Sequence, residues 1–397
     1  MIKWIREQFN ASFTQEKYKH FLQDLDLAHP GAIDFRIAET PIFIDRELGK
    51  QMIETCEYII DFIKSPGFNA CTEKSIPSNE RVQHQNNICQ FIAFDFGICE
   101  DRDGSYFPAL IEMQGFPTLF GMQAYYPEIL EKHFAIPDGF SHYFNGLNKS
   151  SYIDLLKRVI IGKHSPDEVI LLEIRPETQK TRIDFYCTSD YLGINPVCIT
   201  ALKQEGRQLY YYHNGVKTRI KRIYNRIISD ELNAVKDELG PIIDLTSDID
   251  VEWVPHPNWF YRISKFTLPF LKHPFIPTTH FLNELESIPS DLENHVLKPL
   301  FSFAGQGVVI DVSKKHIADI ADPENWILQR KVKYAPCITT PDGPAKAEVR
   351  LMYIWENGNE RPTLATNLAR LSKGKMIGVR YNKDKDWVGG SVAYFEQ

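Results

Sequence analysis

The chain has 397 residues, of which 43% are hydrophobic, 24% charged and 12% aromatic, and its formal net charge is −7. This composition is typical of a globular protein, and the length exceeds what one hydrophobic core usually serves, so we expect two or three subdomains. The mixed, slightly acidic charge argues against a broad nucleic-acid surface, and no stretch approaches the ~20 apolar residues of a membrane span.

The cysteines and the start of the chain indicate the compartment. The seven cysteines are scattered, with no CxxC pair and no Cys/His cluster. This pattern favours reduced, mostly buried thiols and indicates neither a zinc site nor a disulfide framework. Residues 1–7 run into a charged helical pattern without an apolar signal core. We therefore expect a cytoplasmic protein that binds neither nucleic acid nor membrane.

The first segment, residues 1–87, is predicted to be a helical region. Apolar residues recur at helical spacing over residues 3–27 and again over residues 45–64. Proline and polar residues over 65–87 predict a long loop.

A β-hairpin with an acidic face is predicted next, within a segment that covers residues 88–150. Residues 89–98 and 107–114 are rich in strand formers, and a turn separates them. Asp95 lies on the first strand, and Glu112 and Gln114 share one face of the second. Carboxylate and amide oxygens suit Mg²⁺, so this hairpin is a candidate magnesium site. The alternative is a polar stripe that faces solvent.

Residues 151–240 alternate strand and helix patterns, which favours a Rossmann-like α/β layer. A buried-type strand at 168–174 precedes a helix at 181–191 that Gly193 caps, and a second strand follows at 195–199. A hairpin is expected over 209–220. Arg226 belongs to a basic group that could receive phosphate or carboxylate, or could be a solvated basic face. No GxGxxG motif occurs, so dinucleotide binding is not indicated.

The remaining segment, residues 241–397, begins with an expected helical connector crossed by prolines, up to residue 295. Lys298 then lies in an apolar strand, followed by a small-residue loop at 302–307 and a second predicted strand at 308–310. Gly305 and Gly307 would let backbone N–H groups approach a phosphate, and the lysine would add a cation. The alternative is a glycine-containing hairpin whose lysine is solvated.

The order of these motifs resembles a known superfamily. Lys265 ends the segment Trp-Phe-Tyr-Arg-Ile-Ser-Lys, Lys298 precedes Pro299 and the glycine loop, and Gln329 lies in Trp-Ile-Leu-Gln-Arg-Lys. Residues 365–371, with Arg370, look like the family's GGLTRV. The set is similar to the ATP-grasp superfamily, in the circularly permuted arrangement of glutathionylspermidine synthetases and related bacterial carboxylate–amine ligases. The implied fold is α/β (α+β) and ATP-grasp-like, with the Rossmann-like layer on the substrate side.

The resemblance also implies roles for individual residues. ATP would lie on Lys265 and Lys298, with the amides of the glycine loop over its phosphates and Gln329 at the adenine. The expected loop residues are Gly305, Gln306 and Gly307, and the expected Mg²⁺ ligands are Asp95, Glu112 and Gln114. Arg226 falls in a segment like the family's IYRR, and Arg350 and Arg370 would stabilise a tetrahedral oxyanion. Arg350 also fits a strand with an outward-facing charge pair.

The expected activity is ATP-dependent ligation of a carboxylate to an amine through an acyl phosphate, with Mg²⁺ as cofactor. The substrates would be small molecules such as an amino acid, a peptide or a polyamine. Three departures from the family pattern favour an alternative, a catalytically degenerate binding or scaffold protein: Ala93 replaces an arginine, Gln114 replaces an asparagine, and the loop lacks an Arg-Glu pair. An ATP-dependent kinase of the same fold is a third hypothesis.

Overall fold

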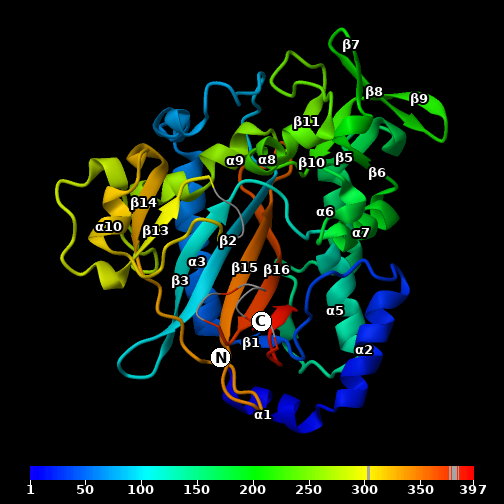
Figure 1. Cartoon of the computed structure of the whole chain (residues 1–397). Coiled ribbons are helices and arrows are strands. Elements are labelled where there is room, and N and C mark those ends of the chain that lie inside the picture. Colours follow the sequence, from blue (N-terminus) through cyan, green and yellow to red (C-terminus); the bar gives the residue numbers. More distant parts are fainter. Residues whose placement is uncertain (302–304, 375–376, 378–381, 383) are drawn as a thin grey trace.

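The computed structural model describes residues 1–301, 305–374, 377, 382 and 384–397, so residues 302–304 of the glycine loop lie outside the described residues. A central antiparallel sheet lies between a smaller sheet and an α/β layer, with helices α1 and α2 at one end (Figure 1). This mixed architecture of helices and several sheets confirms the predicted fold class. In the part of the chain that the structure describes, no helix is long and apolar enough to cross a membrane.

The N-terminal region contains four α-helices: α1 (Lys3–Ser12), α2 (Gln15–Leu27), α3 (Arg46–Lys64) and α4 (Phe68–Cys71). The single helix expected over 3–27 is therefore wrong. It breaks at Thr14, whose side chain accepts a hydrogen bond from the Lys17 amide (3.2 Å) and so caps a new helix. A short strand, β1 (Ile42–Ile44), pairs with β18 (Ala393–Glu396) near the end of the chain, and β18 also pairs with β4 (Phe140–Ser141).

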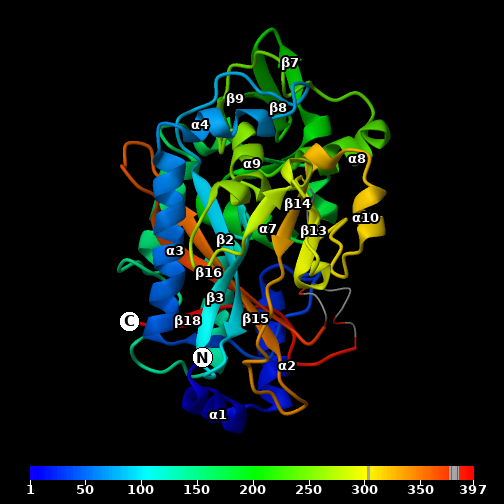
Figure 2. The same cartoon turned by 90° about the vertical axis from the view of Figure 1, so that its left-hand side faces the viewer.

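The central sheet has five strands in the order β17-β16-β15-β2-β3. The bounds are β2 (Phe91–Glu100), β3 (Tyr106–Gln114), β15 (Lys346–Ile354), β16 (Thr363–Ser372) and β17 (Gly389–Ser391). The predicted hairpin is confirmed, with Asp95 opposite Glu112 and Ala93 opposite Gln114. Helix α3 lies along this hairpin in both views (Figures 1 and 2) and packs its apolar side into the same core as the inward residues of β2 and β15.

The α/β layer is Rossmann-like as predicted, although its parallel sheet extends beyond the predicted segment of 151–240 to include β11. Its parallel strands stand in the order β11-β10-β5-β6, with bounds Glu252–Val254, Arg222–Asn225, Val169–Glu173 and Asn195–Cys198. The helices that accompany it are α5 (Met122–His133), α6 (Lys149–Ile160), α7 (Arg182–Leu192) and α8 (Ser229–Leu239). Gly193 ends α7 at φ +70°, as a left-handed cap requires.

The predicted hairpin over 209–220 is also confirmed. Strands β8 (Gln208–His213) and β9 (Val216–Ile220) are joined by Asn214 and Gly215, both at positive φ, and β7 (Lys203–Glu205) extends the pair. These strands project from the α/β layer (Figure 1).

The connector over 241–295 is not helical as expected. It contains strands β11 and β12 (Thr279–Phe281), a short helix α9 (Asn258–Arg262) and the 3-10 helix η5 (Lys265–Phe270). Its prolines remove backbone donors and so prevent any long helix. The second strand expected at 308–310 is reduced to one bridge, between Leu297 and Val309.

The smaller sheet has the order β12-β14-β13, where β13 is His295–Pro299 and β14 is Trp326–Arg330. All pairs are antiparallel, and Lys298 of β13 stands opposite Ile327 of β14. A short helix, α10 (Lys314–Ala318), lies between these two strands in the sequence. All seven cysteines are free and most are buried, as predicted.

Gly115, directly after β3, allows the hairpin to pack closely on α9. A Cβ on this residue would lie 2.4 Å from the Trp259 carbonyl oxygen, and its amide donates to the Ile263 carbonyl (2.8 Å). We expect Gly115→Ala to lower the free energy of unfolding by about 1–3 kcal/mol, because the backbone of α9 must move. Gly67→Ala is the control, since its Cβ would meet nothing within 4 Å. Urea unfolding of both variants checks this, and equal midpoints would contradict it.

Candidate functional site

Ionisable side chains form a row across one face of the central sheet. Asp95 of β2 stands opposite both Glu112 of β3 and Arg350 of β15, and Glu348 of β15 stands opposite Arg370 of β16. Glu348 and Arg350 are two residues apart on one strand, so they share a face. The antiparallel register therefore gathers these charges from distant parts of the sequence.

Asp95 is the centre of this row. Arg350 donates from Nε and Nη2 to the two carboxylate oxygens, each at 2.5 Å, and Arg370 Nη2 donates to Oδ2 at 2.9 Å. Burial alone would raise the pKa of Asp95, whose side chain is 1% exposed, but the Arg350 and Arg370 guanidiniums hold the pKa below its usual value. Asp95 is thus a stable anion that forms a bidentate ion pair with Arg350.

Glu348 is held at the other end of the row. Its carboxylate accepts hydrogen bonds from Arg370 and from the Tyr334 hydroxyl (3.0 Å). Burial raises the pKa of Glu348, and the negative charges of Asp95 and Glu112 raise it further against the attraction of Arg370. Burial opposes the charge on Arg370, yet Glu348 and Asp95 raise the pKa of this guanidinium. Arg370 is therefore a permanent cation, and its side chain is 35% exposed.

Two buried lysines face the row from other elements. Lys298 of β13 donates from Nζ to the Gln329 amide oxygen (2.6 Å) and to the Ile111 carbonyl of β3 (3.1 Å). Burial lowers the pKa of Lys298 to about 8; the attraction of Glu112 opposes this shift, and the nearby charge of Lys265 adds to it. Burial also lowers the pKa of Lys265, the first residue of η5, against the attraction of Glu112 and Asp230. Both lysines are thus attracted by the Glu112 carboxylate. The hydrogen bond from Lys298 to Ile111 also connects the smaller sheet to β3.

Gln329 of β14 orients Lys298. Its side chain is buried, with the amide oxygen on Lys298 and the amide nitrogen donating to the Thr279 hydroxyl (3.2 Å). Every strand of the smaller sheet contributes to this chain of hydrogen bonds. The adenine contact expected for Gln329 stays a prediction.

Glu112 and Gln114 offer oxygen atoms that fit a divalent cation. The Glu112 side chain is 29% exposed and accepts a hydrogen bond from Gln114 Nε2 (3.1 Å). Gln114 Oε1 is buried and has no hydrogen-bond partner among the described residues. Asp95 fits less well, because two guanidiniums use its oxygens and would repel a cation. Among the described residues, no group of three or more His, Cys, Asp or Glu is arranged for a metal ion.

The described part of the glycine loop turns beside Lys298. Gly305 and Gly307 both have φ +73°, a conformation that favours glycine, and all of 305–307 is exposed. Leu297 and Val309 exchange two backbone hydrogen bonds of 3.0 and 2.9 Å, so the loop returns to β13. The predicted turn and its glycine requirement are confirmed for these residues.

Arg226 lies outside the row of charges. It follows β10, donates to the Pro117 carbonyl and lies 3.9 Å from Asp184, with its guanidinium over the Phe185 ring. The next residue in the sequence after Pro117, Thr118, accepts from Arg350 Nη1 at 3.1 Å. The structure therefore places Arg226 one loop away from Arg350 and not beside Asp95.

Some site residues were not found from the sequence. Glu348, Tyr334 and Thr118 complete the network, and Thr279 supports Gln329. The alternative of an outward charge pair at Glu348 and Arg350 is wrong, because both residues are buried. The alternation of charged and apolar residues along this strand could have predicted that Glu348 and Arg350 share a face. Val349 and Leu351, which are apolar, lie on the opposite face and enter the core.

Of the comparisons with known proteins, only the one with solved structures gives a match. No family model matches the chain, and no curated protein matches it. Among solved structures, a glutathione synthetase-like effector from Globodera pallida, in its apo form, has a TM-score of 0.59 at 12% sequence identity. The match covers 96% of each chain.

This match covers nearly the whole of both chains but has a low sequence identity. It therefore shows a shared architecture and does not show a shared activity. The chain therefore has the fold of a glutathione synthetase-like protein.

Proposed function

We propose that the protein is an ATP-dependent carboxylate–amine ligase that forms an amide or peptide bond. The observation that carries this proposal is that two buried lysines, Lys265 and Lys298, lie near Glu112 in the row of charges. A pair of cations next to a carboxylate and a glycine turn suits a polyphosphate with its counter-ion. The glutathione synthetase-like fold supports the same activity.

In this proposal Lys265 and Lys298 bind the ATP phosphates, and the backbone amides of Gly305, Gln306 and Gly307 cover them. Glu112 and Gln114 would hold Mg²⁺, which neutralises charge on the transferred phosphoryl group when bound. Gln329 keeps Lys298 in place. The circular permutation, the domain limits at 87, 150 and 240 and the cytoplasmic location stay predictions.

The reaction would proceed in two steps. A substrate carboxylate oxygen attacks the γ-phosphorus, and ADP leaves to give an acyl phosphate. The amine nitrogen then attacks the acyl carbon, loses a proton, and phosphate leaves with the bonding electrons. Arg370 is partly exposed and is suited to stabilise the tetrahedral oxyanion, while Arg350 holds Asp95 and the row in register. A role for Arg226 in receiving phosphate or carboxylate stays a prediction.

A second candidate function is binding or scaffolding without catalysis. Asp95 and Gln329 both bind partners within the protein, and Ala93 leaves no arginine at that end of the row. An ATP-dependent kinase of the same fold is a third candidate. It needs the same phosphate site but no amine.

The pKa of Lys298 predicts how nucleotide affinity depends on pH. Anionic phosphates favour the protonated lysine, so affinity for ATP should fall by about tenfold as pH rises from 7 to 9, through the pKa of about 8. Lys298→Arg should give a flat profile, because arginine stays charged in this range. Lys298→Met should weaken binding at every pH. Isothermal titration with ATP measures all three proteins, and identical profiles for wild type and Lys298→Met would refute the assignment.

The proposed cation ligands predict a magnesium effect on stability. We expect Mg·ATP to raise the melting temperature more than ATP alone, because a ligand of the native state stabilises it. Glu112→Gln should remove this magnesium-dependent increment. Glu100→Gln, at the exposed end of β2, is the control and should keep it. An increment unchanged in Glu112→Gln would show that the cation binds elsewhere.

An ADP-release screen separates the three functions. The ligase requires both a carboxylate and an amine, so ADP should appear only when the right pair is supplied. Release with a phosphorylated product and no amine would indicate a kinase. ATP binding with no release across amino acids, peptides and polyamines would favour the binding protein. Lys298→Met is the inactive control for every arm.

A further inference from the structure

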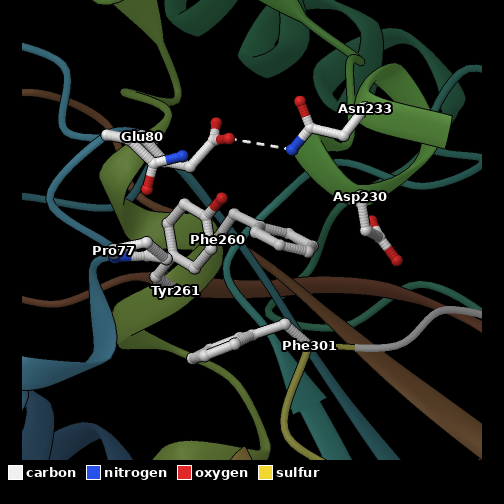
Figure 3. Close-up of a pocket in the computed structure, with 8 residues that line it drawn as sticks. Pro77, Glu80, Asp230, Asn233, Phe260, Tyr261 and Phe301 are labelled. Carbon is white, nitrogen blue, oxygen red and sulfur yellow. Dashed lines mark hydrogen bonds between the residues drawn. The ribbon is translucent and has the colours of Figure 1, made fainter. Parts of the chain in front are cut away.

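A pocket of about 250 Å³ lies between the α/β layer, α9 and the start of the glycine loop (Figure 3). Its lining combines aromatic rings with acidic and amide side chains: Phe260, Tyr261, Phe301, Glu80, Asp230 and Asn233. No lysine or arginine is among the described lining residues. The pocket is therefore both apolar and negatively charged.

The rings form a connected group. Tyr261 makes edge-to-face contacts with Phe260 and Phe301, each with ring centroids 5.1 Å apart. Figure 3 shows these rings with Glu80 and Asp230 beside them, although these residues come from four separate segments of the chain. Aromatic faces carry negative electrostatic potential and attract organic cations.

The acids add formal charge to this environment. Glu80 accepts a hydrogen bond from Asn233 Nδ2 at 2.8 Å, which orients its carboxylate. Asp230 Oδ1 is buried and has no hydrogen-bond partner among the described residues. Partial burial raises the pKa of Asp230, as expected for a carboxylate with an incomplete set of partners. A ligand with N–H donors and a positive charge would satisfy this oxygen.

The pocket adjoins the proposed phosphate site. The charges of Asp230 in the pocket and Glu112 in the row both oppose the lowering of the Lys265 pKa by burial, so Lys265 is near both sites. Phe301 is three residues after Lys298 on the same segment. A molecule in this pocket would therefore reach toward the phosphates bound by the lysines.

We propose that this pocket binds the cationic group of the amine substrate, an ammonium or guanidinium on a short apolar stem. The assignment rests on the proposed ligase function and adds the class of amine to it. Asp230 and Glu80 supply the counter-charge, and Phe260, Tyr261 and Phe301 enclose the stem. Carboxylate groups are disfavoured here, since two acids would repel them.

The test is a ligand-observed NMR titration of the whole protein with n-butylammonium, with and without Mg·ATP. The neutral probe 1-butanol and the anion butyrate have similar stems and lack the positive charge. We expect butylammonium to bind at least about fivefold more tightly than either. Asp230→Asn and Glu80→Gln should each weaken it by about fivefold, and Asp237→Asn, an exposed residue of the same helix α8, should not.

Equal binding of the three probes, or unchanged butylammonium affinity in the Asp230→Asn/Glu80→Gln double variant, would overturn the proposal. Melting curves identify any variant that does not fold, and the two single variants give independent readings. ATP affinity is measured in the same samples. If the wild-type protein binds ATP but not butylammonium, only this pocket assignment is refuted, whereas the absence of ATP binding to the wild-type protein refutes the ligase.

Discussion

The structure depends on one buried interaction, the bidentate ion pair between Asp95 and Arg350, to which Arg370 adds a further hydrogen bond. A buried carboxylate without partners is strongly unfavourable, so these strands are stable together only when the arginines meet it. The contact requires β2 and β15 to be neighbours in the observed register, although about 250 residues separate them in sequence. A shift by one residue would carry each charge to the face that packs on α3.

The other parts of the site are arranged around this row. Lys298 brings the smaller sheet to β3 through the Ile111 carbonyl, and Gln329 fixes that lysine from the adjacent strand. Burial of the lysine lowers its pKa, so the site gains a cation whose charge depends on its anionic neighbours. Such a group is better suited to a bound polyphosphate than to a permanent internal ion pair. The pocket beside Asp230 is lined by acids, and this opposite charge is the reason that we propose it for the cationic group of an amine.

Much of the fold was predictable because its signals are local. Strand-forming residues on both sides of a turn identified the hairpin of β2 and β3, Gly193 identified the end of α7, and the strand–helix–strand order identified the parallel sheet. The failures are local too. Thr14 divided a helix that periodicity alone made continuous, and prolines replaced an expected helical connector with short strands and turns.

The sequence by itself determined which residue types could form a site: lysines, glycines in a turn, and acids that share a strand face. It could not determine the partners, because a side chain's partners depend on strand order and register between distant segments. Only the tertiary structure decided that Asp95 pairs with arginines, that Glu348 and Tyr334 complete the network, and that Arg226 lies apart from it. Burial decided the chemistry, since the charge state of Lys298 and Asp95 follows from desolvation and neighbours that no motif records.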